Sequence, residues 1–156
     1  MAYKKIKPYN LSEDELRKIW REEYCEQEIY TFDKVVVKFY EDMFDHIFYE
    51  SSSRKTKNKD ILSLNRLEKI YWIKDTLQDP DAILKKAWDS KKKDYYKDRR
   101  AAIVKGNYVV IIRFTGLLKA KIVTAFEKND IEKILNDPDF ERSEKYFGEV
   151  VKIKKR

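Results

Sequence analysis

Apolar residues first recur with helical spacing near the amino terminus. Ser12 and Glu15 have the spacing of a capping box, and Leu11 is placed to pack on Leu16 as a hydrophobic staple. The apolar stripe that follows consists of Leu16, Ile19, Trp20 and Tyr24. Because these positions repeat every three or four residues, the pattern predicts an amphipathic helix that begins after Ser12.

Helical spacing returns in the stretch from 63 to 88. The apolar positions of its first part are Leu67, Ile70, Ile73 and Leu77. Asp79 then precedes Pro80, which is the arrangement of a helix cap followed by proline in the first turn. This arrangement predicts a second helix directly after the first. The buried side of that second helix would consist of Ile83, Leu84, Ala87 and Trp88.

Four other stretches have the β-branched and aromatic composition that is typical of strands. They are 33–40 (DKVVVKFY), 94–104 (DYYKDRRAAIV), 108–114 (YVVIIRF) and 119–126 (KAKIVTAF). The second of them could be bent or broken. The tripeptide KGN at 105–107 predicts a hairpin turn in which Gly106 takes a positive φ, and a short turn around Gly116 joins the last two strands.

A last helix is predicted after Asp130, which is placed to cap it. Its inner side would consist of Ile131, Ile134 and Leu135. The order along the chain is then helix, strand, two helices, three strands and helix. Because helices and strands do not alternate regularly, we expect an α+β fold with helices packed on one face of a roughly four-stranded antiparallel sheet.

The length and composition fit one domain. The chain has 156 residues, of which 42% are apolar and 14% aromatic, so it can bury one core although 40% of its residues are charged. No apolar run approaches the ~18 residues of a membrane span, and the first ten residues lack the apolar region of a secretory signal. Cys25 is the single cysteine, so no internal disulfide can form. We expect a cytoplasmic protein, although a toxin domain exported by its own machinery would look the same.

The positive charge is concentrated in three clusters. The formal net charge is +7 and the pI about 9.2. The clusters are 54–59 (RKTKNK), 91–100 (KKKDYYKDRR) and 152–156 (KIKKR). Cations neutralise phosphates and tyrosines stack on unpaired bases, so this composition suits a nucleic-acid partner; a solvated surface with a basic bias is the alternative. Tyr95, Tyr96 and Lys97 could contact RNA or simply lie at the edge of the sheet.

Several signatures of enzymes are absent from the sequence. One histidine and one cysteine cannot form a common zinc site. There is no GxxxxGK[ST], GxGxxG or GxSxG motif. A magnesium site made of carboxylates alone stays open, because the chain has 28 acidic residues, but no spacing singles one out. We therefore expect no cofactor and name no metal ligand.

His46 is the only histidine of the chain, and it stands in the segment FDHIFYES, at the end of a strand or just after one. It is either a core histidine in an aromatic cluster or a general acid–base group. Arg66, inside the next helix, could bind a phosphate or pair with a neighbouring acid. Strand alternation places Thr124 on the face of Ile122 and Phe126, where it could donate to a phosphate or only favour the strand.

Four segments occur together in an order that resembles the phage-associated branch of the Barnase–EndoU–colicin–RelE nuclease superfamily. They are DHIFYESSSRK, LNRLEKIYWIKDTLQDPDAI, YVVIIRF and AKIVTAF. That branch is similar in having a histidine before a basic loop, an arginine that opens a helix, a W-I…L…P…I stretch and a closing V-T-A-[YF] strand. The resemblance covers about 33–127.

The resemblance implies a metal-independent endoribonuclease, often a toxin or conflict effector, with the site on the open face of a four-stranded antiparallel sheet. The positions that match its catalytic motif are His46, Arg66 and Thr124. The residues that would bind RNA are Arg54, Lys55, Lys57, Tyr96 and Lys97. The lysine of the site would be Lys55, Lys57 or Lys97. EndoU-type members use two histidines, so here a Lys, Tyr or Glu takes the second proton transfer, or transition-state stabilisation supplies most of the rate.

The implied organisation is a nuclease core at 33–130 with a helical extension at 1–32 and a helix and basic tail at 131–156, all in one domain. RNA, of which tRNA is one candidate, and an acidic antitoxin or immunity protein are the expected partners; no membrane is expected. Two other functions stay open. They are a non-catalytic nucleic-acid-binding module and a protein-interaction or inhibitor factor whose basic faces meet an acidic partner.

Overall fold

A computed structural model describes residues 3–51, 59–86, 88–89, 94–95, 100–136, 143 and 145–148. Its helices are η1 (Pro8–Asn10), α1 (Glu13–Trp20), η2 (Arg21–Cys25), α2 (Met43–Phe48), α3 (Leu64–Leu67), α4 (Trp72–Gln78) and α5 (Glu132–Leu135). Its strands are β1 (Ile29–Tyr30), β2 (Val36–Lys38), β3 (Tyr49–Ser51), β4 (Lys59–Leu62), β5 (Ile83–Lys86), β6 (Trp88–Asp89), β7 (Asp94–Tyr95), β8 (Arg100–Lys105), β9 (Tyr108–Gly116) and β10 (Lys119–Glu127). The α+β class is therefore confirmed.

The main sheet differs from the expected one in size and direction. Its six strands lie in the order β1-β2-β10-β9-β8-β5, and every neighbouring pair is antiparallel except β2 and β10, which are parallel. The prediction of a roughly four-stranded antiparallel sheet is wrong because β1 extends one edge and β5 the other. Two small hairpins, β3–β4 and β6–β7, stand apart from this sheet among the described residues.

β5 occupies the place of the second predicted helix. Asp79 does not cap a helix start; it ends α4 with an extended backbone, and its carboxylate accepts the backbone N–H of Asp81 at 2.9 Å. This turn directs 83–86 into antiparallel pairing with β8. Leu84 is buried as expected, Ile83 is exposed, and the side chains of 87 and 88 lie outside the described part of the chain.

The helix after Ser12 is confirmed, with both hydrogen bonds of the capping box between Ser12 and Glu15. Its apolar stripe enters the main core: Leu16, Trp20 and Tyr24 are at most 1% exposed. The same core contains residues of the sheet, of α4 and, from the carboxyl-terminal region, Tyr146. The helical extension is thus part of the central packing rather than an appendage.

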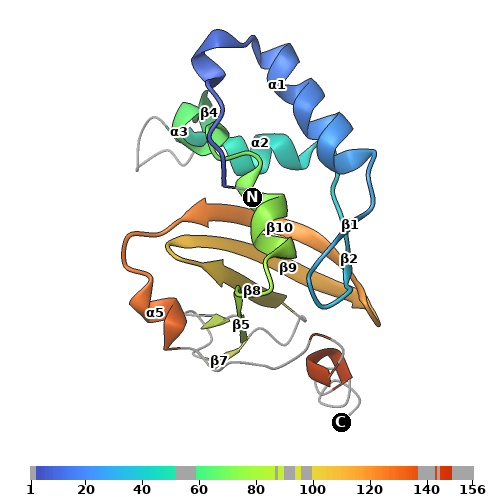
Figure 1. Ribbon diagram of the computed structural model, residues 1–156. Helices are drawn as coiled ribbons and strands as arrows, with labels where there is room; N and C mark the ends of the chain where they lie inside the picture. The colour runs from blue at the N-terminus through green and yellow to red at the C-terminus, as the bar shows by residue number, and fades with distance from the viewer. Residues whose placement is uncertain are drawn as a thin grey trace.

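The sheet has an apolar cluster on each face. The main core lies on the face that α4 covers, in front of the sheet in Figure 1. On the other face, the second cluster joins buried Ala102, Val104 and Val109 to partly buried neighbours. Those neighbours are Ile111, Phe126, Ile131, Ile134 and Leu135. The inner side predicted for the last helix is therefore confirmed, but Ile131 rather than Asp130 stands at its cap position. The expectation that the helices pack on one face of the sheet is wrong, because α5 packs on the face opposite α4.

The two predicted turns differ in where the positive φ falls. Gly106 has φ +58° in the hairpin between β8 and β9, as expected. In the turn between β9 and β10, Leu118 rather than Gly116 takes the positive φ, at 58°. No helix in the described ranges is long and apolar enough to cross a membrane.

Asp79 gives the fold a testable dependence on acid. This carboxylate is buried, 3% exposed, and it accepts from the Asp81 backbone, from the Tyr3 hydroxyl at 2.9 Å and from the Lys105 ammonium at 3.4 Å. The Asp81 hydrogen bond, with help from Tyr3 and Lys105, holds the pKa of Asp79 below its ordinary value. Its stabilisation is present above the unfolded value of about 3.9 and is lost as the pH falls from there through the lower folded value.

We expect Asp79→Asn to be less stable at pH 7 and to lose less stability than wild type between pH 5 and pH 2. The measurement is the free energy of unfolding in urea across that range. Asp130→Asn, at an exposed position, is the matched control and should keep the wild-type acid dependence. Identical acid dependence in wild type and Asp79→Asn would contradict the assignment.

Candidate functional site

His46 lies on the solvent side of a short helix. In α2, Phe44, Ile47 and Phe48 are buried, while Asp45 and His46 are exposed. His46 does not stand at the end of a strand; it lies in a helix that follows strand β2, and the helical period decides which side chains of this segment are buried. In a strand, positions 44, 46 and 48 would share one face, whereas in a helix 44, 47 and 48 do so. The structure therefore excludes the alternative of a histidine sealed in the aromatic core.

His46 lines a groove of about 500 Å³, called here the histidine groove. Three cations line it with His46: Arg100, Arg113 and Lys121. Its other lining residues are Tyr40, Asp42, Met43, Ile122 and Val123. The groove therefore brings the only imidazole of the chain beside three cations from three neighbouring strands.

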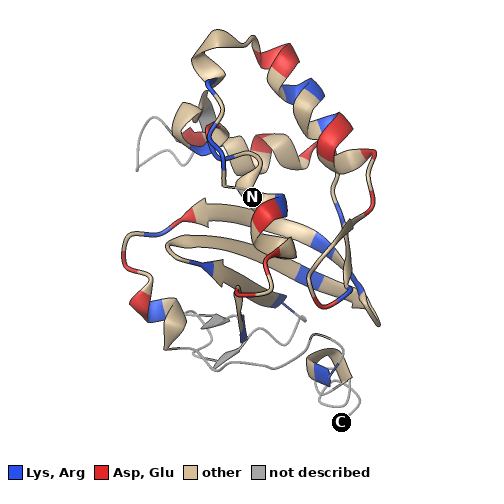
Figure 2. Cartoon of the chain, in the orientation of Figure 1, with Lys and Arg blue, Asp and Glu red and all other residues tan. Residues whose placement is uncertain are grey.

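Strand register arranges those cations in a row. Lys38 of β2 pairs with Lys121 of β10, Lys121 with Arg113 of β9, and Arg113 with Arg100 of β8. Residues directly opposite one another on paired strands project to the same face, and Figure 2 shows blue segments side by side on these strands. We call Lys38, Lys121, Arg113 and Arg100 the basic row.

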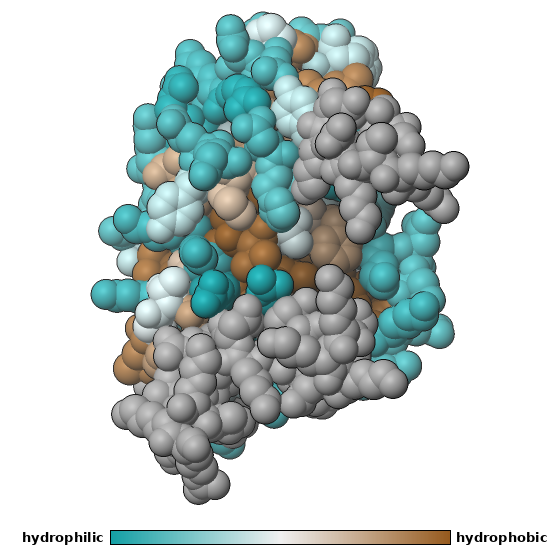
Figure 3. Space-filling view, turned by 180° about the vertical axis from the view of Figure 1, so that it is seen from behind, coloured by the Kyte–Doolittle hydropathy of each residue, from teal (hydrophilic) through white to brown (hydrophobic). Residues whose placement is uncertain are grey.

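The basic row projects away from the main core. Arg113 stands between Ile112 and Phe114, which are both buried in that core, so period-two alternation sends Arg113 to the opposite face. Seen from behind, this side of the molecule has apolar residues in a hollow bordered by hydrophilic ones (Figure 3). The basic row therefore lies on the face that carries the second apolar cluster, but the row and the cluster are at opposite ends of the strands.

The edge of β10 explains why α2 meets the row. Of the residues of β10, only 119–121 pair with β2, and α2 contacts β10. A register shift between Ile122 and Thr124 interrupts the ladder between β10 and β9 at Val123. Val123 and Lys121 both line the histidine groove, so the irregular stretch of β10 lies where α2 presents His46.

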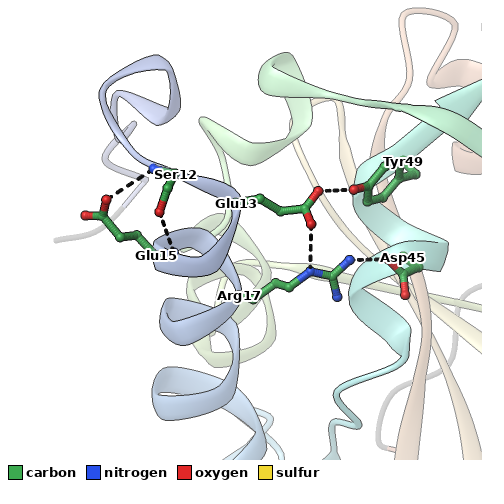
Figure 4. Close-up of polar contacts among 6 residues, drawn as sticks. All are labelled: Ser12, Glu13, Glu15, Arg17, Asp45 and Tyr49. Carbon is green, nitrogen blue, oxygen red and sulfur yellow. Dashed lines mark hydrogen bonds and ion pairs between the residues drawn. The ribbon is translucent and has the colours of Figure 1, made fainter.

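α1 holds α2 in this position through Arg17 (Figure 4). The Arg17 guanidinium donates to Asp45 Oδ1 at 2.5 Å and to Glu13 Oε2 at 3.3 Å, and its Cζ lies 4.5 Å from the centre of the Phe44 ring. The Tyr49 hydroxyl donates to the other oxygen of Glu13, and this hydrogen bond raises the pKa of Tyr49. The helix with His46 is thereby tied to α1 at both of its ends.

Arg66 lies in a different pocket, of about 190 Å³, called here the Arg66 pocket. Its Nη1 donates to the carbonyl of Ile47 at 3.1 Å, in the last turn of α2. Lys69 beside it is 4% exposed and contacts Glu127 Oε1 at 3.1 Å. Burial raises the pKa of Tyr108, which also lines this pocket. The Arg66 pocket and the histidine groove share no lining residue.

Thr124 lines neither of these two hollows. It is half-buried and pairs with Ile111, which packs in the second cluster together with Phe126. The expectation that Thr124 shares a face with both Ile122 and Phe126 is wrong, because the register shift sends Ile122 into the main core. The structure thus does not gather the three motif residues in one of these hollows.

The remaining expected RNA contacts lie outside the described part of the chain. They are Arg54, Lys55, Lys57, Tyr96 and Lys97. Sequence reasoning, in turn, missed Tyr40 and three cations of the basic row, Lys38, Arg113 and Lys121. A signal for these three cations does exist. VVKF, IIRF and AKIV each place one cation inside an otherwise apolar stretch of strand, and only the register shows that the three cations are neighbours.

The described residues contain no group of three or more His, Cys, Asp and Glu side chains that could hold a metal ion. Comparisons with family models, with curated proteins and with solved structures give no match for the chain.

The role of Arg17 in holding α2 leads to a prediction about stability. Arg17→Leu removes two ion pairs and one cation–π contact, and we expect the free energy of unfolding to fall by about 1 kcal/mol. Hydrogen exchange of the α2 amides should become faster than in wild type. Lys18→Leu, on the exposed side of α1, is the control. If both variants lose the same stability and leave hydrogen exchange in α2 unchanged, Arg17 does not hold α2 in place.

Proposed function

We propose that the protein is a metal-independent endoribonuclease whose reaction takes place in the histidine groove. The observation that supports this most strongly is the exposed His46 in one groove with Arg100, Arg113 and Lys121. An imidazole can exchange protons near neutral pH, and cations on rigid strands can hold a phosphate. The resemblance of 33–127 to nucleases names the same histidine.

The reaction would be an attack of the ribose 2′-hydroxyl on the adjacent phosphorus. The 2′-oxygen forms a bond to phosphorus while the bond from phosphorus to the 5′-oxygen breaks. The 2′-hydroxyl proton passes to a base, and the leaving 5′-oxygen takes a proton from an acid. The products are a 2′,3′-cyclic phosphate and a 5′-hydroxyl, and His46 serves as the base or the acid.

The basic row supplies the electrostatic part of this mechanism. Charge on the nonbridging phosphate oxygens rises in the transition state, and fixed cations lower its energy because they need not reorganise. Arg113 offers a planar fork of donors that matches two phosphate oxygens, and Lys121 offers a point charge. Both side chains start from paired strands, which hold them more firmly than a loop would.

The second proton transfer falls to another residue of the groove. Tyr40 and Lys121 line it and carry the group types expected for that role. Arg66, in contrast, acts in this proposal through the carbonyl of Ile47, so it positions α2 rather than touching RNA. The resemblance extends the proposal to a cytoplasmic toxin or conflict effector that cleaves an RNA such as tRNA and is blocked by an acidic protein over the basic row.

A non-catalytic nucleic-acid-binding module is the second candidate. The basic row favours it directly, because neutralising phosphates needs no imidazole. The two candidates differ in what a change at His46 does: it abolishes the activity of an enzyme and leaves a binding module almost unaffected.

We expect wild-type protein to cleave RNA and His46→Ala to lose cleavage by about 10²–10⁴-fold, which is the usual contribution of a general acid–base group. The assay follows an end-labelled RNA on a gel and identifies a cyclic phosphate terminus. His46→Gln, which keeps hydrogen bonding without proton transfer, should be as inactive as His46→Ala. RNA affinity should stay near that of wild type in both variants.

The same assay in excess EDTA should show undiminished cleavage. Complete loss with EDTA and recovery with magnesium would contradict the mechanism. Binding by wild type without any cleavage would support the binding module instead.

RNA affinity should fall steeply with salt, because each neutralised phosphate releases counterions. Arg113→Gln should lower the slope of log K against log salt by about 0.7, which is the contribution of one neutralised phosphate on a single strand. The measurement is fluorescence anisotropy of a labelled oligonucleotide from low to physiological salt. Lys18→Gln, an exposed cation on α1, is the control and should leave the slope unchanged. If Arg113→Gln and wild type have equal slopes, the basic row is not part of the RNA-binding surface.

A further inference from the structure

A second groove continues the histidine groove across the sheet. It has a volume of about 630 Å³ and shares Tyr40 and Lys121 with the histidine groove. Lys38 and Lys119 also line it, so we call it the lysine groove. Because Lys38 and Lys121 belong to the basic row, the row runs from one groove into the other.

The charge of the lysine groove fits a polyanion. Three lysines line it, Lys38, Lys119 and Lys121, and Glu28 is the acidic residue among its lining side chains. Glu28 already accepts a hydrogen bond from the Tyr30 hydroxyl at 3.0 Å. The basic row crosses three inter-strand steps of about 4.8 Å, or roughly 14 Å in all. A stacked strand advances by about 3.4 Å per nucleotide, so the row is long enough for about four nucleotides.

Tyr40 stands at the junction of the two grooves with a fixed backbone and an exposed ring. The Trp20 indole N–H donates to the Tyr40 carbonyl at 2.9 Å, and Trp20 itself is buried. The preceding residue, Phe39, packs edge-on against Trp20 with ring centres 5.4 Å apart. The Tyr40 side chain nevertheless remains 46% exposed. An aromatic ring on a fixed backbone between cations is the arrangement that stacks on an unpaired base.

We propose that the lysine groove binds the part of a single-stranded RNA next to the cleaved phosphate, with one unpaired base stacked on Tyr40. This inference rests on the proposed function and adds the substrate class: an unpaired strand rather than a duplex. Paired bases are already stacked within a duplex and are not available to Tyr40, whereas each base of a single strand offers a free face. Lys38 and Lys119 contact the phosphates that lie in the lysine groove, beside the stacked base.

The test uses a single-stranded RNA oligonucleotide with 2′-O-methyl groups, which cannot be cleaved, and its matched duplex. Anisotropy should show the single strand bound at least tenfold more tightly than the duplex. Tyr40→Ala should weaken single-strand binding about tenfold, and Tyr40→Phe should restore it, because phenylalanine keeps the aromatic face on which a base stacks. Lys119→Ala should weaken binding and lower its salt dependence.

Two control variants show whether these effects belong to the groove. Tyr9→Ala removes a tyrosine that is 66% exposed, and Lys18→Ala removes an exposed lysine of α1; neither lines the lysine groove. Both should bind as wild type does. Equal affinity for strand and duplex, or unchanged binding by Tyr40→Ala, would overturn the inference. Because the oligonucleotide cannot react, this outcome is independent of cleavage: an active enzyme could fail it, and a non-catalytic binding module could pass it.

Discussion

The position of the site depends on one constraint at the edge of β10. β2 pairs with three residues of that strand and then ends at Lys38. The chain must turn there, and α2 contacts β10 with Phe44, Ile47 and Phe48 buried in the main core. Once three of its six residues face the core, helical geometry leaves His46 on the outside. The contact of a short helix with a sheet edge thus places the imidazole beside the basic row.

α1 makes that contact stable and also shapes the neighbouring groove. Arg17 binds Asp45 of α2, and three residues along the same helix Trp20 holds the backbone of Tyr40. The aromatic rings of Phe39 and Tyr24 pack on Trp20 with ring centres 5.4 and 4.9 Å away. Residues 1–32 fall outside the segment that resembles nucleases, yet Arg17 holds the helix with His46 and Trp20 holds the backbone of Tyr40 at the groove junction. A truncation of this region would therefore disturb the site as well as the core.

Sequence patterns predict the helices, strands and turns that neighbouring residues determine. They do not predict an element whose structure depends on pairing with a distant strand. The capping box of Ser12, the hairpin at Gly106 and the long strands β9 and β10 follow from neighbouring residues, and all three are present. Asp79 and Pro80 match a helix start, so the local pattern predicts a helix that includes 83–86. That segment is a strand because β8 offers it an edge, and no local pattern encodes that pairing.

The same limit applies to the site. The order of motifs along the chain points to His46, Arg66 and Thr124 as site residues. In the structure, Arg66 donates to the carbonyl of Ile47. The irregularity at Val123 places Thr124 and Ile122 on opposite faces of the sheet. His46 is the residue of that motif which the structure places in a groove with cations. Convergence of Lys38, Lys121 and Arg113 depends on register between strands that are far apart in sequence, so only the folded chain reveals it.

Cations directly opposite one another on paired strands are costly, and the basic row contains three such pairs. Like charges directly opposite one another destabilise a sheet. The strands tolerate this because their other face is deeply buried: Ile112, Phe114 and Ile122 are at most 2% exposed in the main core. Fully burying one such side chain contributes about 1.5–3 kcal/mol. The buried face therefore holds these strands together independently of the row, and under the proposed function the phosphates of an RNA strand would be the anions that the row binds.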